Sequence, residues 1–580
     1  MNLFEEISQL VKETLKVITK RPESFNRTSL EKITIEPPRL AAYGDMATNA
    51  ALVLTSKNDS PRDLAQELAI KLTKDKRILK AAVAGPGFVN LKLSLDCWHH
   101  VLKAILSDGD NFGRSNFGAG KRVNIEFVSA NPTGPLHVGH TRGAVFGDAL
   151  GNLLSFAGYR VTREYYINDA GAQIEALARS VYFRYLQAIG KKVVVDDMDY
   201  PGEYLAPVGE ALAQQYGDKW ADQPEQVWLK EIGDYAGDIM MKKIQEDLAS
   251  LGVKMDVFFS EKSLYGTGRI EAALKQLQEK GLIYEGILDP PKGKFIEDWE
   301  RREQTLFKST EHGDDVDRPL KKSDGTWTYF APDIAYHFDK IARNFDILID
   351  VLGADHGGYV KRMKAAVSAL SDGKVSLDTK LIQLVRLQKN GRPFKMSKRA
   401  GSFVTLRDLI ETVGAGVTRF VMLTRKNDAP LEFDFDKALE QSRDNPVFYV
   451  QYANARVVSI FRRAKEEGIP ITDDMLRNAD LSVLNHEMEI AVLRKLAEWP
   501  RAVEMAARSN EPHKIAFFLN ELAGEFHRLW NLGSDDSNLR FIQPNDIPAS
   551  QSKIALVRAV SIVISSGLGI LGVTPLQEMR

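Results

Sequence analysis

Residues 123–147 read VNIEFVSANPTGPLHVGHTRGAVFG, and this stretch decides the fold. Val123, Ile125 and Phe127 alternate with polar residues, which is the period-two pattern of a strand. A turn rich in proline and glycine follows, and from about His140 apolar residues recur at helical spacing. A strand, a turn and a helix in this order begin a doubly wound α/β unit. Ligands of such sheets bind at the carboxyl ends of the strands, where the N–H groups of a helix start attract phosphate.

The predicted turn contains His137 and His140, with Gly139 between them so that a ligand can approach the backbone. Two histidines at this spacing can also be metal ligands or ordinary residues of a helix start. HVGH resembles the HIGH signature of class I aminoacyl-tRNA synthetases and of related nucleotidyltransferases. In that family the imidazoles hydrogen-bond ATP phosphates while negative charge builds up at the α-phosphate. The resemblance implies ATP binding at all three residues and catalytic roles for both histidines.

A second motif, FKMSKRAG at residues 394–401, closely matches the KMSKS loop of the same family. There the loop places lysines on the β- and γ-phosphates of ATP, as mobile point charges. A basic loop is more often solvated surface, but HVGH followed by KMSKR in one chain is hard to obtain by accident. The only departure from KMSKS is Arg399. The resemblance implies ATP binding by Lys395, Met396, Ser397 and Lys398, with catalytic roles for the two lysines.

The composition is that of a large soluble protein. A chain of 580 residues should hold several domains. Its 77 Lys+Arg and 78 Asp+Glu leave a net charge of -1, so a nucleic-acid partner must be met by local basic patches. The single cysteine, Cys97, excludes a disulfide framework and a thiolate zinc knuckle and fits a reducing compartment. The apolar run Ile554–Val573 is interrupted by polar residues and predicts a buried helix, not a membrane span. We expect a cytoplasmic location and no membrane contact.

Residues 1 to about 105 predict a separate α+β module. Phe88 and Asn90 would project from one face of a strand. One interpretation is an edge strand with one core aromatic. The other is a platform on which an unstacked base lies on Phe88 and bonds Asn90. The segments YGD at 43–45 and GPGFVN at 85–90 are similar to the additional N-terminal domain of arginyl-tRNA synthetases, which touches the tRNA corner. This resemblance implies the platform.

The middle of the chain reads as a catalytic domain. Residues about 118–390 alternate strand and helix patterns, which predicts a Rossmann-like parallel sheet. Long polar-faced helices at about 190–300 predict an insertion, and 391–440 should hold the KMSKR loop and connecting helices. YINDAGAQI, after a predicted strand, matches the arginyl-type family, and its Asp169 could equally be a helix N-cap.

Residues 441–580 predict an all-α domain. It resembles the anticodon-binding helical domain that closes arginyl-tRNA synthetases. Phe526 and Trp530 lie at helical spacing on one face, where an aromatic pair is usually core. The family uses aromatics at matching positions to hold anticodon bases, which implies tRNA binding by Tyr452, Phe526, Trp530 and Met579.

A pocket for a guanidinium group needs carboxylates, because only they match its planar fork of N–H donors with opposite charge. Glu126 ends the first strand, and WTYFAPD at 327–333 places Tyr329 and Asp333 around a proline. In the family, acids at matching positions meet the substrate. We assign Asp333 to the guanidinium and Glu126 to the ammonium or the guanidinium. The competing interpretations are a helix-start cap for Asp333, a solvated end for Glu126 and a core position for His356 of GADH. The candidate arginine-binding residues are Glu126, Ser129, Asn131, Tyr329, Asp333 and His356.

Taken together, the motifs identify the chain as a member of the arginyl-tRNA synthetase family. The expected fold is a multidomain α/β protein: an N-terminal α+β tRNA-binding domain, a Rossmann-like catalytic domain with an insertion, and a C-terminal all-α anticodon-binding domain. The resemblance implies that L-arginine and MgATP form arginyl-adenylate, and that arginine passes to the 2′-OH of the terminal adenosine of tRNA(Arg). We expect a monomer with no bound zinc or other permanent cofactor.

Three rivals remain open at this point. A class I synthetase for another amino acid, such as glutamate, lysine or cysteine, would share both signatures. The cysteine enzyme is disfavoured because Cys97 alone cannot make the zinc site that it uses. A small nucleotidyltransferase that makes dinucleotide cofactors would not need the helical tail. A non-catalytic RNA-binding paralogue is disfavoured by the two intact ATP signatures.

Overall fold

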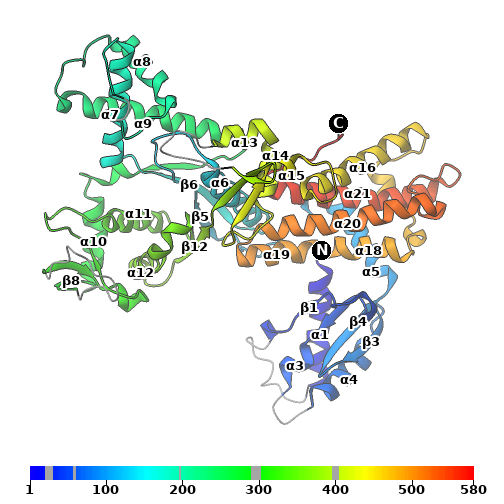
Figure 1. Cartoon of the computed structure of the whole chain (residues 1–580). Coiled ribbons are helices and arrows are strands. Elements are labelled where there is room, and N and C mark those ends of the chain that lie inside the picture. The colour runs from blue at the N-terminus through cyan, green and yellow to red at the C-terminus, as the bar shows by residue number, and fades with distance from the viewer. Residues whose placement is uncertain (20–29, 56–59, 195–197, 289–301, 395–403, 580) are drawn as a thin grey trace.

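The computed structural model describes residues 1–19, 30–55, 60–194, 198–288, 302–394 and 404–579. A central sheet lies between a bundle of C-terminal helices and an arm made of α7 (Ala172–Ala188), α8 (Ala206–Tyr216) and α9 (Glu225–Ser250). The N-terminal domain lies below the C-terminal bundle in Figure 1. The residues of the KMSKR motif that are predicted to bind ATP, Lys395, Met396, Ser397 and Lys398, lie outside the described residues.

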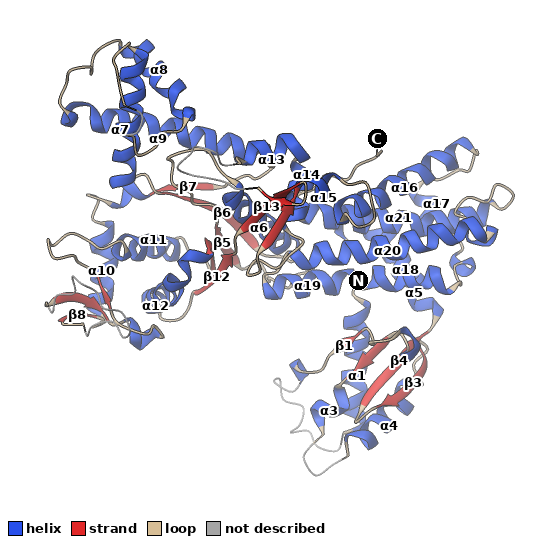
Figure 2. Cartoon of the chain, viewed as in Figure 1, coloured by secondary structure: helices blue, strands red, loops and turns tan. Residues whose placement is uncertain are grey.

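The N-terminal domain packs helices on one side of a four-stranded antiparallel sheet, in the order β1-β2-β4-β3 (Figure 2). The residues Ser60-Pro61-Arg62-Asp63 predict a helix start with Ser60 as the N-cap. The hydroxyl of Ser60 does accept a hydrogen bond from the backbone N–H of Asp63 at the start of α4. Helix α5 then leads to the catalytic domain. The elements are α1 (Leu3–Ile18), β1 (Ile35–Glu36), β2 (Met46–Thr48), α3 (Ala50–Leu54), α4 (Pro61–Leu72), β3 (Ile78–Ala84), β4 (Phe88–Leu93) and α5 (Leu95–Asp108).

The central sheet is five-stranded and parallel, in the order β12-β11-β5-β6-β7. Its strands are β5 (Arg122–Glu126), β6 (Arg160–Ile167), β7 (Val257–Ser260), β11 (Ile347–Gly353) and β12 (Ser376–Ile382). From β5 the chain proceeds to β6 and β7 on one side and returns to β11 and β12 on the other. Between β5 and β11 the strand order therefore reverses, and ligands of open α/β sheets bind at the carboxyl ends of strands at such a point. The predicted Rossmann-like sheet is confirmed.

Strand β5 is buried on both faces. Its apolar residues Val123 and Ile125 pack under helix α6 (Val138–Phe156), whose Gly147 allows a close approach: a Cβ there would lie 2.2 Å from Cγ of Phe127. The alternating polar residues, Asn124 and Glu126, are also buried. Glu126 pairs with Lys340 of helix α11 (Phe330–Ala342), and the amide of Asn124 donates to Glu164 of β6. The alternation in the sequence therefore marks a buried polar layer and not a solvated face.

The predicted insertion at 190–300 needs correction, because β7 lies inside this range and belongs to the central sheet. Two insertions flank β7 instead. The first is an arm of three helices whose core includes the stacked rings of Tyr182 and Trp228, with centroids 3.8 Å apart. The second joins a helix to a three-stranded antiparallel sheet. A four-residue strand is too short for sequence periodicity to reveal. The elements are α7 (Ala172–Ala188), α8 (Ala206–Tyr216), α9 (Glu225–Ser250), α10 (Arg269–Glu279), β8 (Ile283–Gly286), β9 (Gln304–Phe307) and β10 (Arg318–Pro319).

A small sheet, in the order β14-β13-β15, and short helices connect the central sheet to the C-terminal helices. Thr405 and Asp408, three positions apart, have the spacing that predicts a capping box, and they form one at the start of α13. The elements after β11 are α12 (Val360–Ser371), β13 (Val385–Lys389), β14 (Arg392–Pro393), α13 (Leu406–Val413), α14 (Ala415–Met422), β15 (Leu431–Asp434) and α15 (Phe435–Leu439).

The C-terminal region is helical throughout its regular elements. Helix α21 is long and apolar enough to cross a membrane by length and composition. However, 72% of its most apolar stretch of 18 residues is buried inside the protein, and the helix packs against α20, α16 and α5. It is a core helix, as predicted. The helices are α16 (Pro446–Glu466), α17 (Asp473–Arg477), α18 (Glu487–Ala497), α19 (Trp499–Ser509), α20 (His513–Asp535) and α21 (Ile547–Ile570).

Candidate functional site

Both histidines of HVGH lie at the N-terminus of α6. His137 is the N-cap residue, and its Nδ1 accepts a hydrogen bond from the backbone N–H of Gly139 at 3.1 Å. The Nδ1 of His140 accepts from the backbone N–H of His137 at 3.4 Å, and the two rings stack with centroids 3.8 Å apart. Because Nδ1 accepts in both rings, each neutral imidazole carries its proton on Nε2. Two N–H donors thus lie side by side at a helix N-terminus, where the helix dipole favours an anion.

The chain that leaves the KMSKR motif runs beside these histidines. The backbone N–H of Val138 donates to the carbonyl of Val404 at 3.2 Å, and that of Leu406 donates to the carbonyl of Leu136 at 2.8 Å. His137 and Thr405 form an antiparallel bridge between these bonds. The first residues described after the KMSKR motif are therefore hydrogen-bonded to HVGH, which follows the carboxyl end of β5.

Asp333 lies in the first turn of α11, where its carboxylate accepts a hydrogen bond from the hydroxyl of Tyr359. Burial raises the pKa of Asp333 to about 7, and the hydrogen bond from Tyr359 and the nearby His337 lower it by less. The carboxylate of Asp333 is therefore bonded to a side chain and not to the backbone at the helix start, so the competing interpretation of Asp333 as a helix cap is not found. Asp333 is thus a carboxyl group poised to change its charge near neutral pH.

Glu126 is not the solvated strand end that was the competing interpretation, because only 7% of it is exposed. Its Oε1 accepts from the hydroxyl of Ser129 at 3.0 Å, and its Oε2 accepts from the ammonium of Lys340 at 2.6 Å. The turn after β5 brings Ser129 back over Glu126, since Val128 and Ser129 both have positive φ, 71° and 40°. This backbone conformation is rare for a β-branched residue such as valine and is typical of functional sites.

The other candidate arginine-binding residues are more open. The amide of Asn131 donates to Gln173. Tyr329, the N-cap residue of α11, is 79% exposed. His356 lies in an exposed 3₁₀ turn, with its Nε2 3.7 Å from Asp355, so the core alternative for this histidine is wrong.

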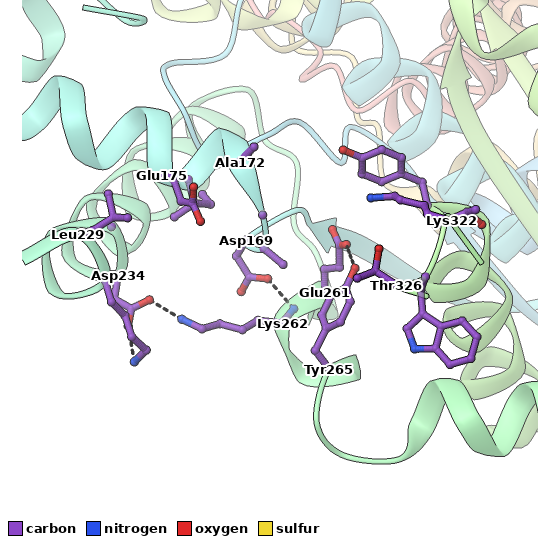
Figure 3. Close-up of a pocket in the computed structure, with 18 of the residues that line it drawn as sticks. Asp169, Ala172, Glu175, Leu229, Asp234, Glu261, Lys262, Tyr265, Lys322 and Thr326 are labelled. Carbon is purple, nitrogen blue, oxygen red and sulfur yellow. Dashed lines mark hydrogen bonds and ion pairs between the residues drawn. The ribbon is translucent and has the colours of Figure 1, made fainter. Parts of the chain in front are cut away.

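A cavity of about 980 Å³ opens where β6 and β7 end (Figure 3). Asp169 follows β6 and accepts hydrogen bonds from the hydroxyl of Ser260 and from the backbone N–H of Lys262, so it ties the ends of the two strands together instead of capping α7. Glu261 lines the same cavity and accepts from the hydroxyl of Tyr265 at 2.9 Å. Tyr329 lines it too, so the cavity reaches the start of the helix that carries Asp333.

Four polar or charged residues near these acids were not among the candidates predicted from the sequence: Tyr359, His337, Lys340 and Asp350. A signal for two of them was present. Asp333, His337 and Lys340 follow one another at i, i+4 and i+7, which places them on one face of a helix. Within the residues that the structure describes, no group of three or more His, Cys, Asp or Glu could hold a metal ion.

The N-terminal candidates lie on the outer face of β4. Phe88 is 41% exposed and Asn90 is half-buried, while Val89 and Leu91 between and after them are buried. Strand β4 lies between β2 and β3, so neither the edge position nor the core aromatic of the competing interpretation is found. An exposed aromatic and an amide thus share one face of a supported strand.

The C-terminal candidates separate into surface and core. Tyr452 is exposed and Trp530 half-buried, and the guanidinium of Arg456 lies over both rings, 4.4 Å and 4.7 Å from their centroids. Phe526 is only 1% exposed and packs on Phe541, so its predicted contact with tRNA needs correction: no base can stack on a ring inside the core.

The chain end is attached near these aromatics. Gln451 and Asn454 of α16 donate hydrogen bonds to the carbonyls of Thr574 and Leu576. Arg462 pairs with Glu578 at 3.1 Å. The half-buried Met579 is the last described residue of a segment that contacts the helix carrying Tyr452.

Comparisons with known proteins agree with this geometry. Three family models match the chain: "Arginyl tRNA synthetase N terminal domain" at residues 5–93, "tRNA synthetases class I (R), catalytic domain" at 101–431, and "DALR anticodon binding domain" at 450–579. The solved Thermus thermophilus arginyl-tRNA synthetase has the same fold, with a TM-score of 0.72, 20% identity and 100% of both chains covered. The parallel sheet with its paired histidines is therefore a class I tRNA synthetase catalytic domain.

Curated relatives narrow the class further. The chain is 67% identical to an arginine–tRNA ligase of Ruegeria pomeroyi and 64% identical to one of Roseobacter denitrificans, with 100% of each chain covered. The chain belongs to the arginyl-tRNA synthetase family.

Proposed function

We propose that the chain is an arginine–tRNA ligase, which activates L-arginine with MgATP to arginyl-adenylate and transfers it to the 2′-OH of the terminal adenosine of tRNA(Arg). The observation that carries the proposal is a pair of carboxylates, Asp333 and Glu126, near the point where the strand order reverses. Full-length relatives named arginine–tRNA ligase support it. Pyrophosphate exchange with each of the twenty amino acids, with and without tRNA, tests it: exchange with an amino acid other than arginine would contradict it.

Phosphate chemistry falls to the two signatures. The Nε2–H groups of His137 and His140 are suited to donate to phosphate oxygens as charge develops at the α-phosphate. Gly139 lets the nucleotide approach the helix start. Lys395, Met396, Ser397 and Lys398 belong to this site by their motif, and the backbone bonds at Val404 and Leu406 support this assignment. Adenylate formation needs positioning and charge stabilisation, and no protein nucleophile.

The pocket for arginine combines one poised and one fixed acid. Asp333 is assigned to the guanidinium, since burial disfavours its ionised form and a bound cation would stabilise that form. Glu126, which Lys340 already neutralises, is assigned to the ammonium group of the substrate. Tyr329, Ser129, Asn131 and His356 are assigned to the surroundings of the same pocket.

Phe88 gives a first test of tRNA binding. Phe88→Ala should weaken tRNA binding by about 1–3 kcal/mol, because a stacked base would lose its aromatic platform. Leu79→Ala, at a 71% exposed residue of the neighbouring strand β3, is the matched control and should leave binding unchanged. The measurement is KM for tRNA in aminoacylation. Equal KM values for the Phe88 variant and the parent would refute the platform.

Trp530 and Phe526 separate recognition from packing. Trp530→Ala should weaken tRNA binding by about 1–3 kcal/mol if an anticodon base stacks on it or on the Tyr452 beside Arg456. Phe526→Ala, one turn away in the core, should instead lower the free energy of unfolding by about 3–5 kcal/mol and leave the tRNA affinity of the folded fraction unchanged. Filter binding and thermal unfolding measure the two effects. Reduced stability with unchanged tRNA affinity in the Trp530 variant would make Trp530 a core residue.

The chain is further proposed to act as a cytoplasmic monomer. Its one cysteine, Cys97, is buried and unpaired, as expected in a reducing compartment.

A further inference from the structure

A lysine with no exposed surface lies beneath the proposed arginine pocket. Lys340 is 0% exposed, and its Nζ donates to Oε2 of Glu126 at 2.6 Å and to Oδ1 of Asp350 at 3.1 Å. These three residues belong to α11, β5 and β11, the elements that meet where the strand order reverses. A buried ion needs such partners, because its desolvation is otherwise unfavourable by several kcal/mol.

The bonds continue from Asp350 to the second acid of the pocket. Oδ2 of Asp350 faces Nε2 of His337 at 3.0 Å, and Nδ1 of His337 faces the backbone carbonyl of Asp333 at 2.8 Å. A carboxylate and a carbonyl only accept hydrogen bonds, so both ring nitrogens of His337 donate and the ring is an imidazolium. Burial lowers the pKa of His337, but the charge and hydrogen bond of Asp350 and the charge of Glu126 together leave this pKa above its usual value, which agrees with this assignment.

The charges in this layer balance. Glu126 and Asp350 bring two negative charges, and Lys340 and His337 bring two positive ones. The neighbouring Glu164 is paired separately with Arg343 at 2.7 Å. Asp333 is left as the carboxyl group that an incoming cation can neutralise.

We propose that Lys340 is a positioning residue for arginine: its buried ammonium fixes the carboxylate of Glu126 and, through Asp350 and His337, the backbone of Asp333. Lys340 does not touch the substrate. It holds the two acids of the pocket in one geometry, so that both meet the same ligand. This inference rests on the proposed arginine pocket.

The direct test is Lys340→Met, which keeps most of the length of the side chain and removes the charge. Glu126 would then have no cation, while Asp350 would keep only His337. One of the two carboxylates would take up a proton, and Glu126 would lose its fixed orientation. We expect the Kd for L-arginine, measured by calorimetry on the full-length protein, to rise about 10–100-fold, as when partners that orient metal ligands are removed. The KM for ATP should stay within about twofold, since the bonds of Lys340 go to Glu126 and Asp350 of the proposed arginine pocket.

Lys553→Met is the matched control. Lys553 is also buried, and its ammonium lies 2.5 Å from Glu489 between α21 and α18, in the C-terminal helices. Loss of this ion pair should lower Tm without changing the Kd for arginine. A second variant, Lys340→Met with Asp350→Asn, removes one negative charge as well and should recover Tm while arginine binding stays weak, because Glu126 still lacks its lysine.

An unchanged Kd for arginine in Lys340→Met would overturn the positioning role, and so would recovery of both Tm and arginine affinity in the double variant. If the single variant does not fold, the Kd for arginine of the double variant is the test: a weakened Kd supports the positioning role, and an unchanged Kd overturns it. Failure of the proposed function is a separate result: the unmodified protein would then bind no arginine, or Asp333→Asn would bind it normally.

Discussion

Asp333→Asn should abolish most arginine activation. The guanidinium would lose its charged partner inside the pocket, and breaking a buried charged pair is unfavourable by about 3–5 kcal/mol, roughly two to three and a half powers of ten in kcat/KM. Arginine-dependent pyrophosphate exchange measures this loss. The KM for ATP should change little, because the histidine pair is untouched.

Citrulline makes the test specific for charge. It has nearly the shape of arginine but offers an oxygen where the guanidinium donates, so the unmodified site should reject it by roughly 10⁴-fold. The gap should narrow in Asp333→Asn. Tyr359→Phe is the matched control, because it removes the hydrogen bond to Asp333 and keeps the carboxylate. A wild-type KM for arginine in Asp333→Asn would place the guanidinium partner elsewhere.

The same carboxyl gives this prediction a pH signature. With a pKa of about 7, Asp333 is protonated below that pH in the free protein and ionised above it. A guanidinium favours the ionised form, so arginine affinity should fall as the pH drops below 7, and binding near pH 7 should release protons. In Asp333→Asn this dependence should disappear. For stability the sign is opposite: burial raises the pKa above the unfolded value, so the folded state loses stability as the pH rises from about 4 to 7.

Local sequence patterns predicted much of this architecture because they report on backbone and neighbours in the chain. The Ser60–Asp63 cap, the Thr405–Asp408 box and strand β5 all follow from residue types within a few positions. The four-residue strand β7 was not predicted, since so short a run has no measurable period.

The residues that share one face of a helix or strand could be predicted from the sequence, but the residues that pack against that face could not. The sequence placed Phe526 and Trp530 together, but only the packing of Phe541 shows that one ring is in the core. The sequence left open whether Glu126 lies in a substrate pocket or at a solvated strand end, and only the structure shows that Lys340, distant in the chain, pairs with it. Long-range ion pairs of this kind leave no local pattern, apart from the helical spacing of Asp333, His337 and Lys340.

The histidine pair should show the second large effect. His137→Asn should lower kcat for adenylate formation about 10²–10³-fold, as when one donor to a developing oxyanion is removed. The KM for arginine should change little, because the lost hydrogen bond would be formed mainly in the transition state. Single-turnover formation of arginyl-adenylate measures the step directly. The same loss of kcat is expected when the Nε2–H donor of His140 is removed.

The choice of asparagine separates catalysis from helix capping. His137 is also the N-cap of α6, and its Nδ1 accepts from the backbone N–H of Gly139. Asparagine is among the best N-cap residues, so His137→Asn keeps an acceptor for the helix start but has no donor at the position of Nε2. His137→Ala loses both and should also reduce stability by about 0.5–2 kcal/mol. If capping were the whole role, the asparagine variant would keep full kcat and only the alanine variant would be impaired. Equal losses of kcat in the two variants, with Tm lowered only in alanine, would assign the Nε2–H of His137 to the phosphate.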